Sequence, residues 1–184
     1  LCVEQFLARK PYWLYAARIG TELLLRLGQH DEARMLFEAV IKTRALPWAK
    51  LGVARAQIES GQTGRAITTL QGLVGEDPAF ADAYDVLGRA QVEQGNFAQA
   101  IDTYRTASEL TPDSLVRLQK LGMMSYYMGN QTTAAQVLAR AAILGIDSKL
   151  FDYQSLVLLA FSYRAEKDSK GIDRCIADFG RMLE

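Results

Sequence analysis

A single spacing recurs along this chain and constrains its fold more than any other feature. Three kinds of residue repeat at intervals of 34 positions: Gly61, Gly95 and Gly129; Ala66, Ala100 and Ala134; and Pro78 and Pro112. Independent residue types that share one period of about 20–50 residues indicate a tandem repeat protein. A unit of this length cannot bury its own apolar face, so we expect the units to stack on one another.

The unit from Ala81 to Ser114 shows what each repeated position does. Two antiparallel helices can approach closely where a residue is small, as at Gly88, while a large residue such as Tyr104 fills the space between neighbouring helices. Gly95 falls in the turn, where a positive φ suits glycine alone. Pro112 follows the second helix, which cannot continue through a proline. The unit is therefore expected to be a helix–turn–helix.

The period divides the chain into units and predicts eleven helices and no strands. We expect one array over residues 1–184, made of 1–13 (the second helix of a truncated repeat), 14–46, 47–80, 81–114, 115–148 and 149–184 (an atypical C-terminal helical pair). Because the first unit holds only a second helix, we expect the chain to be a fragment of a longer protein. The last helix carries an apolar stripe that we expect to be buried: Ile172, Ile176, Phe179 and Leu183.

The order of residues within a unit resembles a known repeat. In the unit from 81 to 114 the matching positions are Tyr84, Leu87, Gly88, Gly95, Ala100, Tyr104, Ala107 and Pro112. This order and spacing is similar to that of the tetratricopeptide repeat, and the resemblance covers nearly the whole chain. It implies an all-α fold, a right-handed α-solenoid (superhelix) of tandem helix–turn–helix repeats.

A narrower resemblance rests on three segments. Residues Lys10–Ala17, Leu46–Ala56 and Asp147–Phe161 look like the C-terminal repeat region of bacterial response regulators, in which a receiver domain precedes the repeats. This resemblance implies a two-component signalling protein whose repeats bind a partner as the output. The receiver and its phosphoacceptor aspartate would then lie upstream of Leu1.

Composition narrows the classes of partner. Lys plus Arg and Asp plus Glu each number 21, so the formal net charge is zero. A neutral chain has no long-range field to attract nucleic acid, and it carries no polybasic patch for an anionic membrane. Its apolar runs are too short to span a bilayer. Cys2 and Cys175 stand at opposite ends of the array, so we expect free thiols, a reducing compartment and a cytoplasmic location.

Residues that could perform catalysis are scarce. The single histidine, His30, is expected to be a solvated turn residue. Cys175 has no histidine near it in sequence, which favours a small residue in or beside a buried helix face over a nucleophile. No metal-binding motif, Walker-type loop or nucleophile elbow occurs. We therefore expect no enzymatic activity, no cofactor and no metal site.

The repeat resemblance also indicates where a partner would bind. In this family the first helix of each unit lines the concave face, and fixed positions of that helix contact the partner. The predicted groove residues are Tyr15, Arg18, Glu22, Trp48, Arg55, Glu59, Asp85, Arg89, Glu93, Met123, Tyr126 and Tyr127. Position 9 of the units holds Glu22, Arg55, Arg89 and Met123, whereas the clamp that binds chaperone tails needs Asn there, so we expect no chaperone-tail binding.

Two interpretations of the groove charges remain open. Arg55 and Arg89 occupy the same position in adjacent units, each with a glutamate four residues later at Glu59 and Glu93. They can form ion pairs within each helix, contributing roughly 0.2–0.5 kcal/mol each. They can also form an arginine ladder that binds a partner's carboxylates through bidentate forks. Both can hold, because the glutamate can orient the arginine.

The aromatic positions have two interpretations as well. Part of the set around Met123 is expected to be core, which leaves Tyr126 and Tyr127 as candidate exposed anchors. Trp48 either contacts a partner or packs at the start of its helix. Taken together, the sequence predicts a scaffold that binds another protein or peptide in its groove. The alternative is a self-association module that forms homodimers or larger oligomers through its terminal repeats.

Overall fold

The computed structural model describes residues 13–182, and every helix or strand in that range is an α-helix. In chain order these are α2 (Trp13–Arg26), α3 (His30–Thr43), α4 (Pro47–Glu59), α5 (Thr63–Glu76), α6 (Ala81–Glu93), α7 (Phe97–Leu110), α8 (Leu115–Tyr127), α9 (Gln131–Gly145), α10 (Tyr153–Ala165) and α11 (Ser169–Met182). The predicted all-α class is confirmed. The helix expected over residues 1–10, with Cys2, lies outside the described residues.

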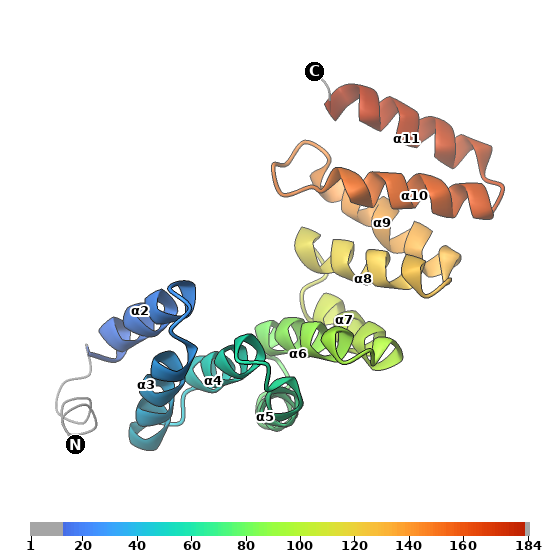
Figure 1. Cartoon of the computed structure of the whole chain (residues 1–184). Coiled ribbons are helices and arrows are strands. Elements are labelled where there is room, and N and C mark those ends of the chain that lie inside the picture. Colours follow the sequence, from blue (N-terminus) through green and yellow to red (C-terminus); the bar gives the residue numbers. More distant parts are fainter. Residues whose placement is uncertain (1–12, 183–184) are drawn as a thin grey trace. The chain divides into compact units, whose positions relative to one another are not determined.

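The helices form two compact units that meet in sequence between Asn96 and Phe97. Figure 1 shows α2 to α6, from blue to green, in the first unit, and α7 to α11, from green to red, in the second. Within each unit every helix packs against the next one along the chain. First helices also touch directly, α2 with α4 and α4 with α6 in unit 1, and α8 with α10 in unit 2. Side chains on first helices therefore meet across repeats.

The turn inside each helix pair has one residue in the left-handed conformation. Four of these residues are glycines with φ between 74° and 79°: Gly28, Gly61, Gly95 and Gly129. The fifth is Lys167, with φ of 60°. A residue with a Cβ is held there at a cost of about 1 kcal/mol, which glycine does not incur. The C-terminal pair, in which the sequence pattern lacks its glycine, thus makes the same turn with a lysine.

The buried core residues of the second helices recur at fixed distances from these turn glycines. The fifth, ninth and twelfth residues after each turn glycine are buried in every second helix from α3 to α9. They are Ala33, Phe37 and Val40; Ala66, Leu70 and Leu73; Ala100, Tyr104 and Ala107; and Ala134, Leu138 and Ala141. Residues three and four apart lie on one helix face, so these positions form the stripe that packs against neighbouring helices.

At Gly122 and Gly52 a large side chain of a neighbouring helix occupies the space that a Cβ would take. A Cβ on Gly122 would lie 2.5 Å from the Leu138 side chain, so α8 and α9 approach closely at the small position that the repeat pattern predicts. A Cβ on Gly52 would lie 2.2 Å from the Phe37 ring. Gly52 is outside the repeat pattern, and this contact joins α4 to the second helix of the preceding pair.

The last helix corrects one prediction. Ile172, Ile176 and Phe179 were expected to be buried, yet Ile176 is 65% exposed and the other two are half-buried. The buried residues of α11 are Gly171 and Cys175. A Cβ on Gly171 would lie 2.6 Å from the Tyr163 ring, so α10 approaches this face of α11 and leaves the apolar stripe largely uncovered. Leu183 lies outside the described residues.

His30 and Cys175 also differ in burial. His30 was expected to be a solvated turn residue, but it is the first residue of α3 and is half-buried. Its Nδ1 is buried without a hydrogen-bond partner among the described residues. Cys175 is 2% exposed, as predicted for a small residue on a buried face, and burial raises the pKa of its thiol to about 11. A thiol with so high a pKa is a poor nucleophile at neutral pH.

Candidate protein-binding surfaces

The first helices of unit 1 carry a row of ion pairs that joins one repeat to the next. The row, hereafter the charge ladder, consists of Glu22 on α2, Arg55 and Glu59 on α4, and Arg89 and Glu93 on α6. Contacts between α2 and α4 and between α4 and α6 bring these side chains within reach of one another. The ladder therefore depends on repeat stacking as well as on residue spacing within each helix.

The first ion pair of the charge ladder joins Arg55 to the preceding repeat. The Arg55 Nη1 donates to Glu22 Oε1 at 2.6 Å, across helices α2 and α4. Glu59, four residues after Arg55 and its possible partner within α4, pairs with Arg89 of the next repeat instead. The sequence spacing could not reveal this, because the i,i+4 rule concerns one isolated helix and the stacking of first helices offers a competing carboxylate.

The second part of the charge ladder is centred on Arg89. The Arg89 Nη2 donates to Glu59 Oε1 at 2.5 Å, and Nε donates to Glu93 Oε1 at 3.0 Å. The expected i,i+4 pair therefore forms on α6 beside an inter-repeat pair. The hydrogen bond from Arg89 lowers the pKa of Glu59, and the hydrogen bond to Glu59 raises the pKa of Arg89. Both groups are thus held in their charged forms.

The ladder remains open to solvent. The side chains of Arg55 and Glu22 are each 39% exposed, and those of Arg89 and Glu59 are 50% and 44% exposed. Ion pairs this exposed typically contribute only about 0–1 kcal/mol to stability, since water and salt screen them. Replacing a ladder glutamate by a carboxylate of another molecule at such an arginine therefore has a small net cost in free energy.

Aromatic residues flank the ladder on α2 and α4. Trp48 is half-buried and packs edge-on against Phe37, with ring centroids 6.1 Å apart and an angle of 67°. The Arg18 guanidinium lies over the Trp48 ring at 5.7 Å from its centroid, a cation–π contact. Trp48 thus takes the packing role that we weighed for it, while Tyr15 on α2 is 72% exposed.

Asp85 completes the predicted positions in unit 1. It precedes Arg89 by four residues on α6, so the two side chains share one helix face with Glu93. Asp85 is half-buried. The α2, α4 and α6 positions that we predicted therefore lie in the same unit, and five of them form the ion pairs of the charge ladder.

The predicted positions in unit 2 are only partly exposed. Met123 and Tyr126 are half-buried and pack against the core of the α8–α11 region. Tyr127 is 65% exposed and meets the Tyr126 ring at 5.6 Å between centroids, with an angle of 81°. Neighbouring residues on a helix point about 100° apart, so the two tyrosines lie on different faces of α8. Of the two candidate anchors, Tyr127 is the exposed one.

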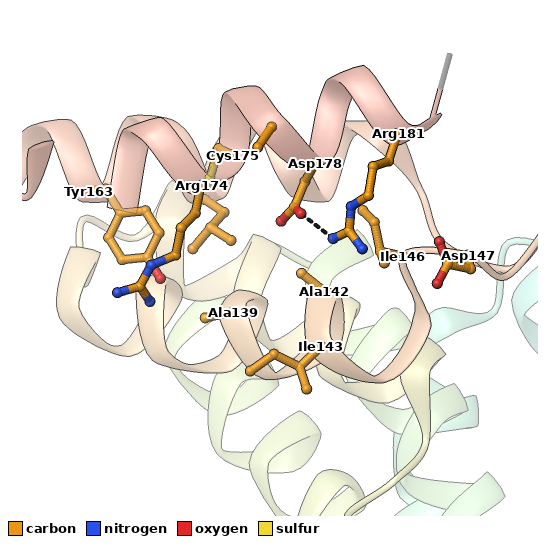
Figure 2. A pocket seen from close by; sticks show the side chains of 12 residues that line it. Ala139, Ala142, Ile143, Ile146, Asp147, Tyr163, Arg174, Cys175, Asp178 and Arg181 are labelled. Carbon is orange, nitrogen blue, oxygen red and sulfur yellow. Dashed lines mark hydrogen bonds and ion pairs between the residues drawn. The ribbon is translucent and has the colours of Figure 1, made fainter. Parts of the chain in front are cut away.

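Unit 2 also contains a cleft that the repeat pattern did not predict. It has a volume of about 460 Å³ and lies against α9, α10 and α11. Figure 2 shows Arg174 beside Tyr163, and Asp178 directed toward Arg181, with which it forms an ion pair. Sequence reasoning missed the cleft because it depends on how far α11 stands from α9, which residue spacing does not specify.

We also searched residues 13–182 for metal sites and for membrane-spanning helices. Within that range no three His, Cys, Asp or Glu side chains are grouped closely enough to hold a metal ion. None of the helices in the same range is both long and apolar enough to cross a membrane.

A comparison of the sequence with models of known protein families assigns the chain to one family. A tetratricopeptide repeat model matches residues 24–87 and again residues 58–121, and the two matches together cover more than half of the chain. The chain belongs to the tetratricopeptide repeat family. Proteins of this family serve as scaffolds for protein–protein interaction, and helix–turn–helix repeats stacked as an all-α solenoid are their common architecture.

Solved structures of this family share the fold. MamA from Desulfovibrio magneticus RS-1 has a TM-score of 0.70 and 15% identity, covering 92% of both chains. YrrB, described as a TPR protein with an unusual peptide-binding site, has a TM-score of 0.72 and 11% identity, covering 99% of this chain and 92% of that one. Identities this low support the fold alone.

Curated relatives of this tetratricopeptide chain are far longer. Superkiller complex protein 3 from Mus musculus is 28% identical over 118 residues, which cover 62% of this chain and 8% of that protein. Tetratricopeptide repeat protein 37 from Xenopus laevis is 25% identical over 122 residues, which cover 65% of this chain and 8% of that protein. The chain thus spans less than a tenth of the length of these relatives.

Proposed function

We propose that this chain is a protein-binding module whose groove in unit 1, along the charge ladder, takes a segment of another protein or a peptide. The observation that carries the proposal is the row of half-exposed inter-repeat ion pairs Glu22–Arg55 and Glu59–Arg89. Arg55 and Arg89 offer planar forks that suit carboxylates. The proposed partner segment carries acidic side chains that replace Glu22 at Arg55 or Glu59 at Arg89.

The exchange of carboxylates is physically reasonable because little is lost when it occurs. A half-exposed ion pair contributes at most about 1 kcal/mol, and the displaced glutamate regains its hydration. The raised pKa of Arg89 keeps its guanidinium charged, which favours its pairing with the incoming carboxylate. Aromatic residues beside the ladder, Tyr15 in particular with 72% exposure, supply apolar contact area for the same segment.

The broader setting is a further part of the proposal. The segments Lys10–Ala17, Leu46–Ala56 and Asp147–Phe161, which resemble the repeat region of bacterial response regulators, support a role as the output of a cytoplasmic two-component protein. The coding sequence upstream of Leu1 tests this part, since a receiver domain encoded there is the expected result and any other domain contradicts it.

A selection experiment tests the groove. A display library of random peptides is selected on the wild-type chain, and the enriched peptides are synthesised and titrated by fluorescence anisotropy. We expect enrichment of peptides with acidic side chains and binding at least about 10-fold weaker to an Arg55→Glu/Arg89→Glu variant, which corresponds to 1.4 kcal/mol. Circular dichroism checks that the variant keeps its helices.

A matched control separates the groove from general electrostatics. Arg105 and Arg140 in unit 2 also form exposed ion pairs, with Asp102 and Asp113. An Arg105→Glu/Arg140→Glu variant changes the net charge by the same amount and is expected to bind the selected peptides as the wild type does. Equal weakening in both variants, or unchanged binding in the Arg55→Glu/Arg89→Glu variant, contradicts the proposal.

A further inference from the structure

The cleft between α9 and α11 in unit 2 has a counterpart one repeat earlier. A cleft of about 540 Å³ lies between α7 and α9, above the same face of the intervening first helix. Its lining stands in the same register, since Glu109 is the fourteenth residue after Gly95, as Ile143 is the fourteenth after Gly129. Clefts of this kind therefore arise from the spacing between successive second helices, whichever helix follows them.

One wall of the α9–α11 cleft is apolar where its counterpart is polar. The tenth, thirteenth, fourteenth and seventeenth residues after a turn glycine form this wall in both clefts. They are Arg105, Ser108, Glu109 and Pro112 in the earlier cleft, and Ala139, Ala142, Ile143 and Ile146 in the later one. An apolar side chain of a ligand can therefore lose water against the α9 wall, which is favourable in proportion to the area covered.

Ile143 is the exposed edge of this apolar wall. The fourteenth residue after the turn glycine is exposed in each second helix from α3 to α9, where it is Lys42, Gly75, Glu109 and Ile143. Packing within the array does not call for an apolar residue at a position that stays exposed. The Ile143 side chain is nevertheless 84% exposed, beside the half-buried Ile146.

The opposite wall carries charged side chains on one face of α11. Arg174, Asp178 and Arg181 follow one another at intervals of four and three residues, and Figure 2 shows them directed from α11 toward α9. Arg181 pairs with Asp178, and this hydrogen bond, together with the charge of Asp147, raises the pKa of Arg181. Two lining carboxylates thus face one guanidinium, which leaves this end of the cleft with a net negative charge.

The other end of the cleft is positive. The exposed Arg174 guanidinium lies beside the Tyr163 ring and forms no ion pair with a carboxylate of residues 13–182. Arg174 and Arg181 are seven residues apart, which is about 10 Å along a helix with a rise of 1.5 Å per residue. A positive end and a negative end about 10 Å apart therefore lie opposite the apolar α9 wall.

We propose that this cleft is a second docking site of the chain, which takes an extended peptide segment with an acidic, a large apolar and a basic side chain. The acidic side chain pairs with Arg174, and the apolar one packs on Ile143. The basic side chain lies at the end formed by Asp147 and Asp178. An extended strand advances about 3.3 Å per residue, so the acidic and basic residues are three positions apart, with the apolar residue at a central position.

The size and the charge of the cleft fit such a segment. Its volume of about 460 Å³ falls within the range of about 300–1,000 Å³ that is common for ligand sites. The lining charges cancel, with two arginines and two aspartates, so the cleft does not favour a polyanion such as nucleic acid. The site lies on second helices of unit 2 and is independent of the charge ladder in unit 1.

Peptides selected from a random display library on the wild-type chain test this site. We expect one enriched class to carry the pattern acidic–x–x–basic with a large apolar residue at one of the two central positions. Synthetic peptides of this class are titrated by fluorescence anisotropy. They are expected to bind the Arg55→Glu/Arg89→Glu variant as they bind the wild type, so the outcome at this site is distinguishable from the outcome at the charge ladder.

Two substitutions in the cleft have matched controls outside it. Arg174→Glu and Ile143→Asp each replace an exposed residue, so circular dichroism is expected to be unchanged. Each is expected to weaken binding of these peptides at least about 10-fold. Arg164→Glu on α10 and Ile176→Asp on α11 make the same changes at exposed residues that do not line the cleft, and they are expected to bind like the wild type.

A charge exchange identifies the residue that meets the acidic side chain. A peptide whose acidic residue is replaced by lysine is expected to bind the wild type poorly. The same peptide is expected to bind the Arg174→Glu chain at least about 10-fold more tightly than it binds the wild type, because the exchange restores an ion pair of opposite sign. The Arg164→Glu chain is expected to give no such gain.

Three results overturn the proposal. Absence of the acidic–x–x–basic pattern among the enriched peptides shows that the cleft does not take such a segment. Equal binding by the cleft variants and their controls shows that the peptides bind elsewhere. A lysine-substituted peptide that gains nothing on the Arg174→Glu chain shows that Arg174 does not meet the acidic side chain.

Discussion

The contact between Gly52 and Phe37 allows a quantitative prediction about the junction between repeats. In a Gly52→Ala variant the new Cβ would lie 2.2 Å from two carbons of the Phe37 ring, whereas carbon atoms in contact are normally about 3.5 Å apart. The ring would have to move by roughly 1.3 Å. It is 1% exposed and surrounded by Val40, Ala49 and Trp48, so it has little room to do so.

The expected change in stability is the difference between two opposing effects. Overpacking a core typically costs about 1–3 kcal/mol, and the severity of this overlap indicates the upper end. Replacing glycine by alanine within a helix returns about 1 kcal/mol. We therefore expect Gly52→Ala to lower the free energy of unfolding of unit 1 by about 1–2 kcal/mol.

Tryptophan fluorescence during urea unfolding reports this change in stability for unit 1. The chain has two tryptophans, Trp13 and Trp48, and both belong to the hydrophobic cluster around Phe37 in unit 1. The matched control is Gly72→Ala on α5, where nothing lies within 4 Å of the new Cβ. That variant is expected to gain about 0.5–1 kcal/mol.

The outcome that refutes this reasoning is a Gly52→Ala variant as stable as the Gly72→Ala control. A Phe37→Leu substitution supplies a second check, because a smaller side chain leaves room for the Cβ. In the Phe37→Leu background, Gly52→Ala is expected to cost at least about 1 kcal/mol less than it does in the wild type, the coupling expected of residues in contact.

Three further predictions follow from individual contacts. Lys167→Gly is expected to stabilise unit 2 by about 0.5–1 kcal/mol in thermal unfolding, because glycine adopts the left-handed turn without strain, and a destabilised variant contradicts this. The pKa of Glu59, measured by NMR titration, is expected to lie below 4.5 and to rise in an Arg89→Met variant. The stability that this ion pair contributes is present above the ordinary pKa of Glu59 and is lost as the pH falls through the lowered pKa. A pKa that does not change in the variant argues against the pair. In a Cys2→Ser background, Cys175 is expected to react with a thiol reagent at pH 8 only after unfolding, because burial raises the pKa of its thiol from 9.0 to about 11. The stability that follows from this shift is present below pH 9 and declines as the pH rises toward 11. Rapid labelling of the folded chain contradicts the burial of Cys175.

The sequence predicted those parts of the fold that depend on local spacing. The period places the left-handed glycines and the buried stripe of α3, α5, α7 and α9, because each follows from the geometry of a single helix pair. The stripe of α11 was predicted to be buried on the same reasoning. Ile176 is exposed because α10 packs against a different face of α11, the one that carries Gly171 and Cys175, and a local pattern does not specify which face the preceding helix meets.

The charge ladder shows the same limit at the candidate site. The sequence placed Arg55, Arg89 and their glutamates on the first helices, and those helices do contact one another. One of the two interpretations left open an ion pair between Arg55 and Glu59, whereas Arg55 pairs with Glu22. The choice between two carboxylates depends on how far one repeat is displaced along the next, and residue spacing within a helix carries no information about that displacement.

The central claim is that the first helices of unit 1 hold a partner segment, and hydrogen–deuterium exchange tests it most directly. Exchange is measured by mass spectrometry on the chain alone and with a saturating acidic peptide from the display selection. We predict that protection is concentrated in α2, α4 and α6, whose side chains form the charge ladder. Protection concentrated in α3 and α5, or in unit 2, would contradict the account.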